Sequence, residues 1–246
     1  MPQPNLRISP AVLARIGGVL YLIIIFAGLF GEAFFRDRLI VSGDATATVE
    51  RIRSAETLWR LGIAGNLLHL ACAVGLALIL YVLLRPVSRS LAQLAVLFEL
   101  VSIGIESVIK VFLVVPLLAQ GSAEYLASFD PGQLHALAYL SIRLHAYGFG
   151  ISLIFFGCAC VVLGYLIFRS GFLPRWVGIL MQIAGVCYVT NSFALVLAPA
   201  VADRLFPAIL IPCFIGEASL CLWLIAKGVN VEKWHSQSIA ASTVNA

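Results

Sequence analysis

Long apolar runs dominate the chain, and charged residues interrupt them at only a few points. A membrane-spanning helix needs about 20 apolar residues in a row, and six runs are long enough. The fourth of them ends at Phe168 and begins as early as Gln133. The runs lie at about 13–34, 60–84, 91–118, 133–168, 176–198 and 205–226. The pattern therefore predicts six transmembrane helices.

The composition supports an integral membrane protein. Of the 246 residues, 61% are hydrophobic and 11% are charged, whereas soluble domains have about 45–50% apolar and about 25% charged residues. Long unbroken runs favour helices over the alternating pattern of membrane barrel strands. We therefore predict an all-α fold, a polytopic transmembrane bundle of six helices. It forms one domain at 13–227, between an N-terminal tail at 1–12 and a flexible C-terminal tail at 228–246.

Basic residues predict the orientation of the bundle. The connections "RPVSRS" and "RSGFLPR" carry arginines with no acid between them, and both tails add further basic residues. Six spans place all four of these segments on one side, which the positive-inside rule makes the cytoplasmic side. Both termini are then cytoplasmic (N-in, C-in), and 35–55 and 119–132 lie outside. This placement at the ends of apolar runs argues against a nucleic-acid partner.

The histidines and cysteines provide no metal motif. The six cysteines lack metal-ligand spacing, and five of them lie well inside apolar runs, where cysteine acts as a small hydrophobic residue. Neither H-x-x-x-H nor H-E-x-x-H occurs. We predict no metal site and leave the question of cofactors open.

The fourth run begins with a helix-start signal. In "FDPGQ", Asp130 is expected to cap a helix and Pro131 to occupy its first turn. A helix from there to Phe168 is longer than one span, so "SIRLHAYGF" falls in its outermost turns. Arg143 and His145 are two residues apart, which separates their side chains by about 200° on a helix. We expect the arginine to face the outer loop or the lipid headgroups.

The histidine of this pair is expected to face the bundle. His145 shares a stripe with Ser141, Gly148 and Ser152, whose small side chains leave room for a cavity. Its expected partners are acids at the outer end of the first two spans, Glu32 or Glu56. Gly150, Gly157 and Gly164 recur every seven residues on the same run and predict close approach of another helix.

Charged residues at depth mark the candidate site. Each costs about 2.5–3.5 kcal/mol in the middle of a membrane and usually faces the protein interior or a water-filled cavity. Counted along the third run, Glu99 lies in the inner third, Glu106 near the middle and Lys110 in the outer third, all on one stripe. Glu217 of the sixth run lies a little past the middle.

These residues predict one polar cavity in the outer half of the bundle. Its expected floor is Glu106, Lys110 and Glu217, its walls are His69 and Asn191, and its rim is Arg143, His145, Glu32, Glu56 and Arg60. Two simpler interpretations stay open. In the first, Glu106 and Lys110 pair only to fix helix packing. In the second, His69 of the second run is a hydrogen-bonded core residue.

Several sequence blocks carry a family resemblance. The blocks "ARIGGVLYLI", "GLFGE", "LWRLGIAGNLL", "LHAYGF", "GYLIFRSGFLPR" and "IGE" occur in order between about Arg15 and Lys227. In them the chain resembles an uncharacterised family of bacterial multi-pass membrane proteins, a domain of unknown function similar to DUF4386. The resemblance implies a bacterial cytoplasmic (inner) membrane protein of about six helices and brings no activity. The blocks include Glu32, Arg60, His145, Tyr147 and Glu217, and they do not include His69, Glu106 and Lys110.

The predicted cavity favours a binding or transport protein for a small molecule or lipid. Mixed acids and a lysine at mid-depth suit a small amphiphile or cation as ligand and proton-coupled transport. Six helices are few for a transporter, so we expect a homodimer in the lipid bilayer. Two alternatives stay open. One is an intramembrane enzyme that acts on a lipid or isoprenoid through buried glutamates and histidines, and the other is a structural or regulatory membrane subunit.

Overall fold

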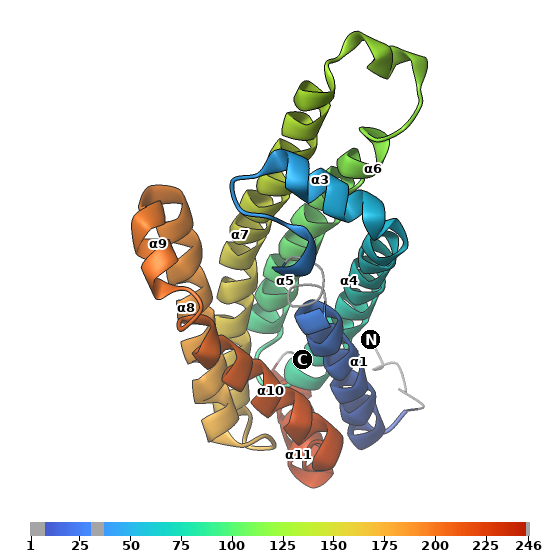
Figure 1. The fold of residues 1–246 in the computed structure, drawn as a ribbon. Helices are drawn as coiled ribbons and strands as arrows, with labels where there is room; N and C mark the ends of the chain where they lie inside the picture. Colours follow the sequence, from blue (N-terminus) through green and yellow to red (C-terminus); the bar gives the residue numbers. More distant parts are fainter. Residues whose placement is uncertain (1–7, 31–36, 245–246) are drawn as a thin grey trace.

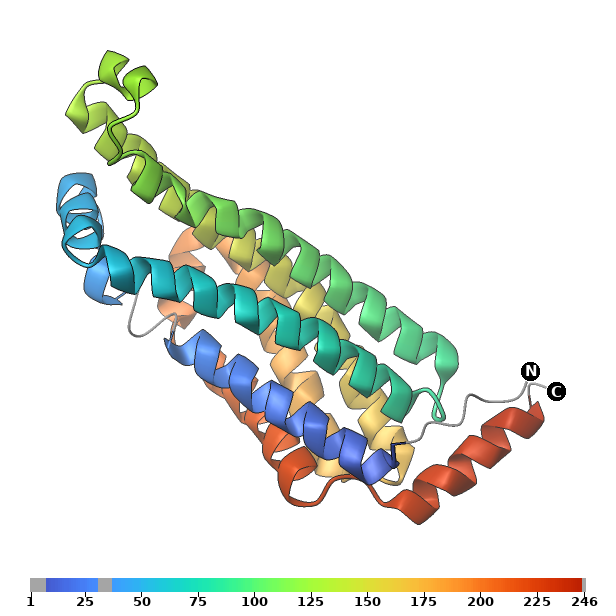
Figure 2. The same ribbon diagram turned by 90° about the vertical axis from the view of Figure 1, so that its right-hand side faces the viewer.

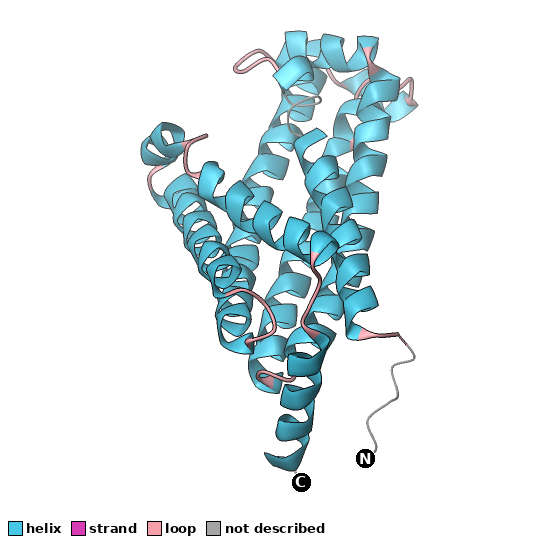
Figure 3. Ribbon diagram, turned by 90° about the horizontal axis from the view of Figure 1, so that it is seen from below, coloured by secondary structure: helices cyan, strands magenta, loops and turns pink. Residues whose placement is uncertain are grey.

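The computed structural model of the chain describes residues 8–30 and 37–244. Every regular element in these residues is a helix, and no strand appears among them (Figure 3). The long helices are α1 (Pro10–Phe30), α4 (Glu56–Leu84), α5 (Arg89–Ile109), α7 (Pro131–Ser170), α8 (Arg175–Leu197) and α10 (Leu210–Ala226). The predicted all-α fold is confirmed.

The long helices form a closed ring (Figures 1 and 2). In chain order, each of α1, α4, α5, α7, α8 and α10 packs against the next, and α10 returns to α1. Each helix therefore has one face toward the ring interior and one toward the outside. The outward faces carry large apolar side chains, among them Leu78, Leu97, Phe193 and Leu222. So wide an exposed apolar surface is typical of a protein in contact with lipid.

Five described helices are long and apolar enough to cross a membrane, or six if one bent pair counts as a span. The bent pair is α9 (Pro199–Leu205) with α10, which are inclined at 57° to each other. Pro207 lies at the break, where a proline cannot donate a backbone hydrogen bond and disrupts a helix. The predicted sixth run at 205–226 is therefore mostly α10, preceded by a turn.

Helix α7 is the longest element and extends beyond the other helices (Figure 2). Its 40 residues correspond to about 60 Å, about twice the hydrocarbon thickness of a membrane. Asp130 caps its first turn in a capping box with Gln133, and Gly171 ends it with a positive φ of 68°. The predicted start is confirmed, and the helix is continuous through 133–149, the part predicted to project beyond the bilayer.

Glycines bring α7 and α8 into backbone contact. A Cβ atom on Gly164 would lie 2.6 Å from the carbonyl oxygen of Gly178, and one on Gly157 would lie 2.7 Å from that of Gly185. Only glycine fits at such distances, and small residues of this kind are how membrane helices pack closely. The heptad spacing of the α7 glycines predicted this close approach. We call this contact the α7–α8 seam.

Helix α5 changes its winding in the outer half of the ring. It passes into a 3-10 turn, η2 (Lys110–Leu113), and then into the short helix α6 (Val115–Leu118), which contains Pro116. A 3-10 stretch inside a long helix is tighter than the α-helix around it and marks a local distortion. The span continues through this distortion from Arg89 to Leu118. Lys110 is the first residue of the distorted turn.

The outer end of the ring is partly covered by the segment after the first span. It contains α2 (Asp37–Leu39) and α3 (Ala45–Ser54), and α3 lies across the tops of α4, α6 and α7 (Figure 1). Asp44 caps α3 at Ala47, and Ile52 of α3 is fully buried beneath it. The predicted outer loop is thus a folded cover.

The basic connections between the spans lie at the opposite end of the ring. The indole of Trp234 donates to the carbonyl of Leu83 at the end of α4, and Asn230 N–H donates to Phe172 between α7 and α8. Trp234 belongs to α11 (Val231–Val244), a helix that crosses this end of the ring (Figure 2). The tail that was expected to be flexible therefore contains a helix, because its tryptophan is buried against α4.

Candidate functional site

A cavity opens between α4, α5 and α7 in the half of the ring that lies under α3. Its volume is about 90 Å³, enough for a few water molecules or a small polar group. It is lined by Gly28, Ile40, Trp59, Gly62, Ile63, Asn66, His69, Glu106, Lys110, Leu113, Ile142, His145 and Phe149. We call it the outer cavity.

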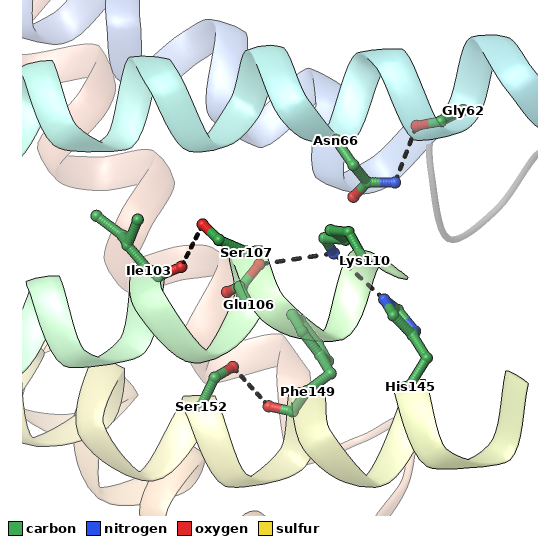
Figure 4. A network of polar contacts seen from close by, with 9 residues as sticks. All are labelled: Gly62, Asn66, Ile103, Glu106, Ser107, Lys110, His145, Phe149 and Ser152. Carbon is green, nitrogen blue, oxygen red and sulfur yellow. Dashed lines mark hydrogen bonds and ion pairs between the residues drawn. The ribbon is translucent and has the colours of Figure 1, made fainter. Parts of the chain in front are cut away.

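A buried lysine joins two helices at the wall of the outer cavity (Figure 4). Lys110 Nζ lies 3.7 Å from Glu106 Oε2 on the same helix and 3.4 Å from His145 Nε2 on α7. The side chains of Lys110 and Glu106 are only 6% and 12% exposed, and His145 is also buried. The three residues place a cation, an acid and an imidazole beside one cavity.

The contact joins an ammonium group to an imidazole ring. A lysine ammonium group has only donors, so a charged Lys110 donates and His145 Nε2 accepts. His145 was predicted to face the bundle toward Glu56 or Glu32, and the inward direction is confirmed.

The partner predicted for His145 is different in the structure. Glu56 pairs instead with Arg60 at 2.8 Å, and both side chains are more than half exposed at the outer end of α4. This i,i+4 pair forms within one exposed turn, at a site where water screens both charges. Glu32 lies outside the described residues. Lys110 reaches the histidine because α5 packs directly against α7.

Aromatic and amide groups complete the wall. Lys110 Nζ lies 5.8 Å from the ring centre of Phe149, within the range of a cation–π contact. The indole of Trp59 donates to the carbonyl of Leu113 at 2.8 Å, which ties α4 to the distorted turn of the third span. Asn66 donates to Gly62 on its own helix, on the face of α4 that looks toward Lys110 (Figure 4). His69, one turn further along α4, also lines the cavity.

Three other predicted residues lie away from this cavity. Arg143 is exposed on the outer face of α7, with its guanidinium 5.7 Å from the ring centre of Tyr147. Arg60 is exposed with Glu56, and Asn191 belongs to α8. Helix α8 packs on α7 and α10, not on α4 or α5. The outward direction predicted for Arg143 is confirmed.

Glu217 forms a separate polar centre. Its carboxylate accepts a hydrogen bond from Tyr21 at 3.2 Å and another from Tyr188. These residues come from α10, α1 and α8, and Glu217 does not line the outer cavity. The single cavity floor predicted from depth alone is therefore divided between two centres, because the ring separates α10 from α5.

Glu99 of α5 is coupled electrostatically to an acid of each centre, Glu106 and Glu217. Its Oε2 atom is buried and has no hydrogen-bond partner among the described residues. Glu99 and Glu106 are seven residues apart on α5, which corresponds to two helical turns and about 10 Å.

Sequence reasoning missed the two tyrosines that bind Glu217. Tyrosine in membrane proteins is typical of the water interface, whereas Tyr21 and Tyr188 lie in the middle of α1 and α8. A buried tyrosine hydroxyl usually has a hydrogen-bond partner. Their positions in the middle of the spans therefore indicate a hydrogen-bond acceptor at the same depth.

The described residues contain no group of three or more His, Cys, Asp or Glu side chains that could hold a metal ion. Their six cysteines are all free, and Cys213 and Cys221 contact backbone carbonyls of neighbouring helices. The side chains of the two centres carry carboxylate, imidazole, ammonium and phenol groups.

A family model described as "Domain of unknown function (DUF4386)" matches residues 16–228. The chain belongs to this family. The matched part runs from α1 to the end of α10, so it contains the whole ring and both polar centres, and it stops before α11. The family resemblance seen in the sequence blocks is confirmed.

A relative from Archaeoglobus fulgidus is an uncharacterized protein. It is 30% identical over 169 residues, which cover 68% of this chain and 83% of the relative. No solved structure matches the chain. Neither the family description nor the relative indicates an activity, so the function has to be argued from the two centres.

Proposed function

We propose that this DUF4386 family member binds a small molecule or the head group of a lipid in the outer cavity and moves it across or within the membrane. The observation that carries this proposal is the buried Lys110, which contacts both Glu106 and His145 at the cavity wall. Charged side chains inside membrane proteins are costly and typically mark ligand or ion paths.

The chemistry of the wall favours a ligand with an anionic or strongly accepting group. Lys110 places an ammonium group at the wall, with the imidazole of His145 beside it. Trp59 and Phe149 provide flat apolar surface next to these donors. Pockets for small ligands commonly combine apolar walls with a few placed polar groups. At about 90 Å³ the cavity suits the polar part of a small amphiphile, not a complete lipid.

The orientation and the assembly are parts of the same proposal. Arg85, Arg89, Arg169 and Arg175 gather at the end of the ring crossed by α11, which supports a cytoplasmic location for that end. The outer cavity then opens toward the far side of a cytoplasmic (inner) membrane. We also propose a homodimer, since a ring of six spans is small for a transporter.

Native mass spectrometry of the full-length protein, released from its own membrane lipids, tests the proposal. We expect a bound small molecule or lipid on wild type, reduced at least about tenfold in Lys110→Met, which corresponds to about 1.4 kcal/mol. The matched control is Arg60→Met, which removes an exposed cation from the same half of the molecule and should keep the ligand.

The competing interpretation is that Lys110 only holds α5 against α7. It predicts a wild-type protein without a bound molecule, whereas a lower melting temperature of Lys110→Met is expected under both interpretations. A wild-type protein without a bound molecule would therefore reject the binding proposal in favour of a structural subunit.

A further inference from the structure

The middle of the ring contains a carboxylate held by two phenols. Tyr21 of α1 and Tyr188 of α8 both donate to Glu217 of α10, so three helices meet at one side chain. Glu99 approaches from α5. Each of the four residues lies nine to thirteen residues from the α11 end of its helix, or about 14–20 Å. They therefore share one level near the centre of a membrane about 30 Å thick.

Among the described residues, neither acid at this level forms an ion pair. Lysine and arginine ion pairs form instead at Glu56 and Glu106. The Oε2 atom of Glu99 is buried and has no hydrogen-bond partner among the described residues. Two negative charges at this depth, with one oxygen left unsatisfied, are strongly unfavourable. The described residues therefore leave the pair without a compensating positive charge.

A proton fits this site better than a metal ion. Both oxygens of Glu217 already accept from tyrosine hydroxyls, which leaves little room for a metal bond. The other groups near Glu217 are thiols, which are neutral weak donors. Among the described residues, the titratable side chains coupled electrostatically to this pair are Tyr21, Tyr188, Cys160, Cys213, Cys221 and Glu106. None of them supplies a positive charge.

We propose that Glu99 and Glu217 together form a proton-binding site at the centre of the ring. A proton from water adds to one carboxylate oxygen to give a carboxylic acid, and no bond in the protein breaks. The charge of the pair changes from two negative charges to one. Tyr21 and Tyr188 stabilise the remaining carboxylate on Glu217.

The site also has a physical connection to the outer cavity. Glu106 lies two turns from Glu99 on α5, and Lys110 lies one turn further on the same helix. A change of charge at Glu99 therefore acts on Glu106, which pairs with the lysine of the cavity wall. This coupling, though not the proton site itself, depends on the proposed binding function. It makes the proton the coupling ion of the proposed transport.

Infrared spectroscopy of the full-length protein in lipid bilayers at neutral pH tests the site. A protonated carboxyl group has a carbonyl stretch separate from those of carboxylates and amides. We expect this band in wild type, its loss in Glu99→Gln, and a frequency shift in Glu217→Gln and in Tyr21→Phe, which change the neighbouring carboxylate or one of its donors. Glu56→Gln is the matched control, because its exposed side chain already pairs with Arg60, and it should leave the band unchanged.

Two results would overturn the proton site. One is a wild-type spectrum without the band, or a band that persists in Glu99→Gln. The other is a melting temperature that rises with sodium concentration in wild type and not in Glu99→Gln, which would assign the site to a metal ion. The Lys110→Met variant separates the two proposals, since it should lose the bound ligand and retain the band.

Discussion

The outer cavity and the central proton site both hold carboxylates inside a ring of apolar helices. They differ in how the negative charge of these carboxylates is compensated. In the outer cavity a lysine compensates Glu106, and open volume remains beside the pair. At the centre two tyrosines supply neutral donors to Glu217, and the neighbouring backbone is close. A Cβ on Gly216 would lie 2.8 Å from Leu180 O.

This difference indicates two kinds of role. A site with open volume and a buried cation suits an exchangeable ligand, whereas a closed site with neutral donors suits an ion as small as a proton. The packing of the ring agrees with this division. Glycines bring α7 and α8 together at the seam, whereas Trp59 and Phe149 lie between the helices around the cavity.

The strongest test of the comparison is topological, because it decides which centre lies nearer the outside. Ser42, an exposed residue before α3, is expected to be extracellular. A Ser42→Cys variant should react with a membrane-impermeant thiol reagent in intact cells. The wild-type cysteines, which lie in the spans, provide the background control. Labelling only after permeabilisation would mean that the orientation is reversed and that the outer cavity lies nearer the cytoplasm.

Loss of the buried cation should have the largest effect on stability. Lys110→Met breaks the buried pair with Glu106 and the contact with His145. We expect a loss of about 3 kcal/mol in the free energy of unfolding, since removing one partner of a buried pair leaves the other charge uncompensated. Arg60→Met at the exposed pair should cost at most about 1 kcal/mol.

A double variant sharpens this prediction. Adding Glu106→Gln to Lys110→Met removes the acid as well, and it should recover most of the lost stability in a double-mutant cycle. Thermal melting in detergent measures all four proteins. A double variant that is less stable than Lys110→Met would show that the pair is not the main partner of either residue.

The α7–α8 seam should tolerate no added side chain. Gly164→Ala places a methyl group 2.6 Å from Gly178 O and 2.8 Å from Gln182 N, and such overpacking typically costs about 1–3 kcal/mol. Gly104→Ala is the matched control, because a Cβ there meets no atom within 4 Å. The control should be neutral or more stable, since alanine favours helix. Equal melting temperatures for the two variants would contradict the packing of the seam.

The phenol hydroxyl groups of the central site should contribute less to the free energy of unfolding. Tyr188→Phe removes one hydrogen bond to Glu217 and keeps the ring that packs edge-on against Phe156. Hydrogen bonds between membrane helices average about 0.6 kcal/mol, so we expect a loss of that order. Tyr165→Phe, on the exposed face of α7, should change nothing. A loss of several kcal/mol would contradict this ranking and show that the Glu217 carboxylate cannot be held by Tyr21 alone.

The smallest effect on stability is expected at Arg143, the residue of the motif "SIRLHAYGF" that faces outward. Arg143→Lys keeps a cation near Tyr147 and should change stability by less than about 0.5 kcal/mol. His145→Ala, two residues away, removes the partner of Lys110 and should reduce ligand occupancy in native mass spectrometry far more. Equal loss in the two variants would place the arginine in the ligand site.

The sequence by itself determined the class of the molecule and the elements of its fold. Run length and hydropathy are local properties of the chain, so the spans, the start of α7 at Asp130 and the close approach at Gly157 and Gly164 could be read from it. The opposite directions of Arg143 and His145 also followed from helical periodicity alone.

Only the tertiary structure decided which polar residues meet. Depth along a span places Glu106 and Glu217 at similar levels, but it carries no information on which helices are neighbours. The closed ring puts α10 between α8 and α1, so Glu217 meets Tyr188 and Tyr21 in place of Lys110. Partner choice depends on helix order around the ring, which is a long-range property set by packing of all six helices together.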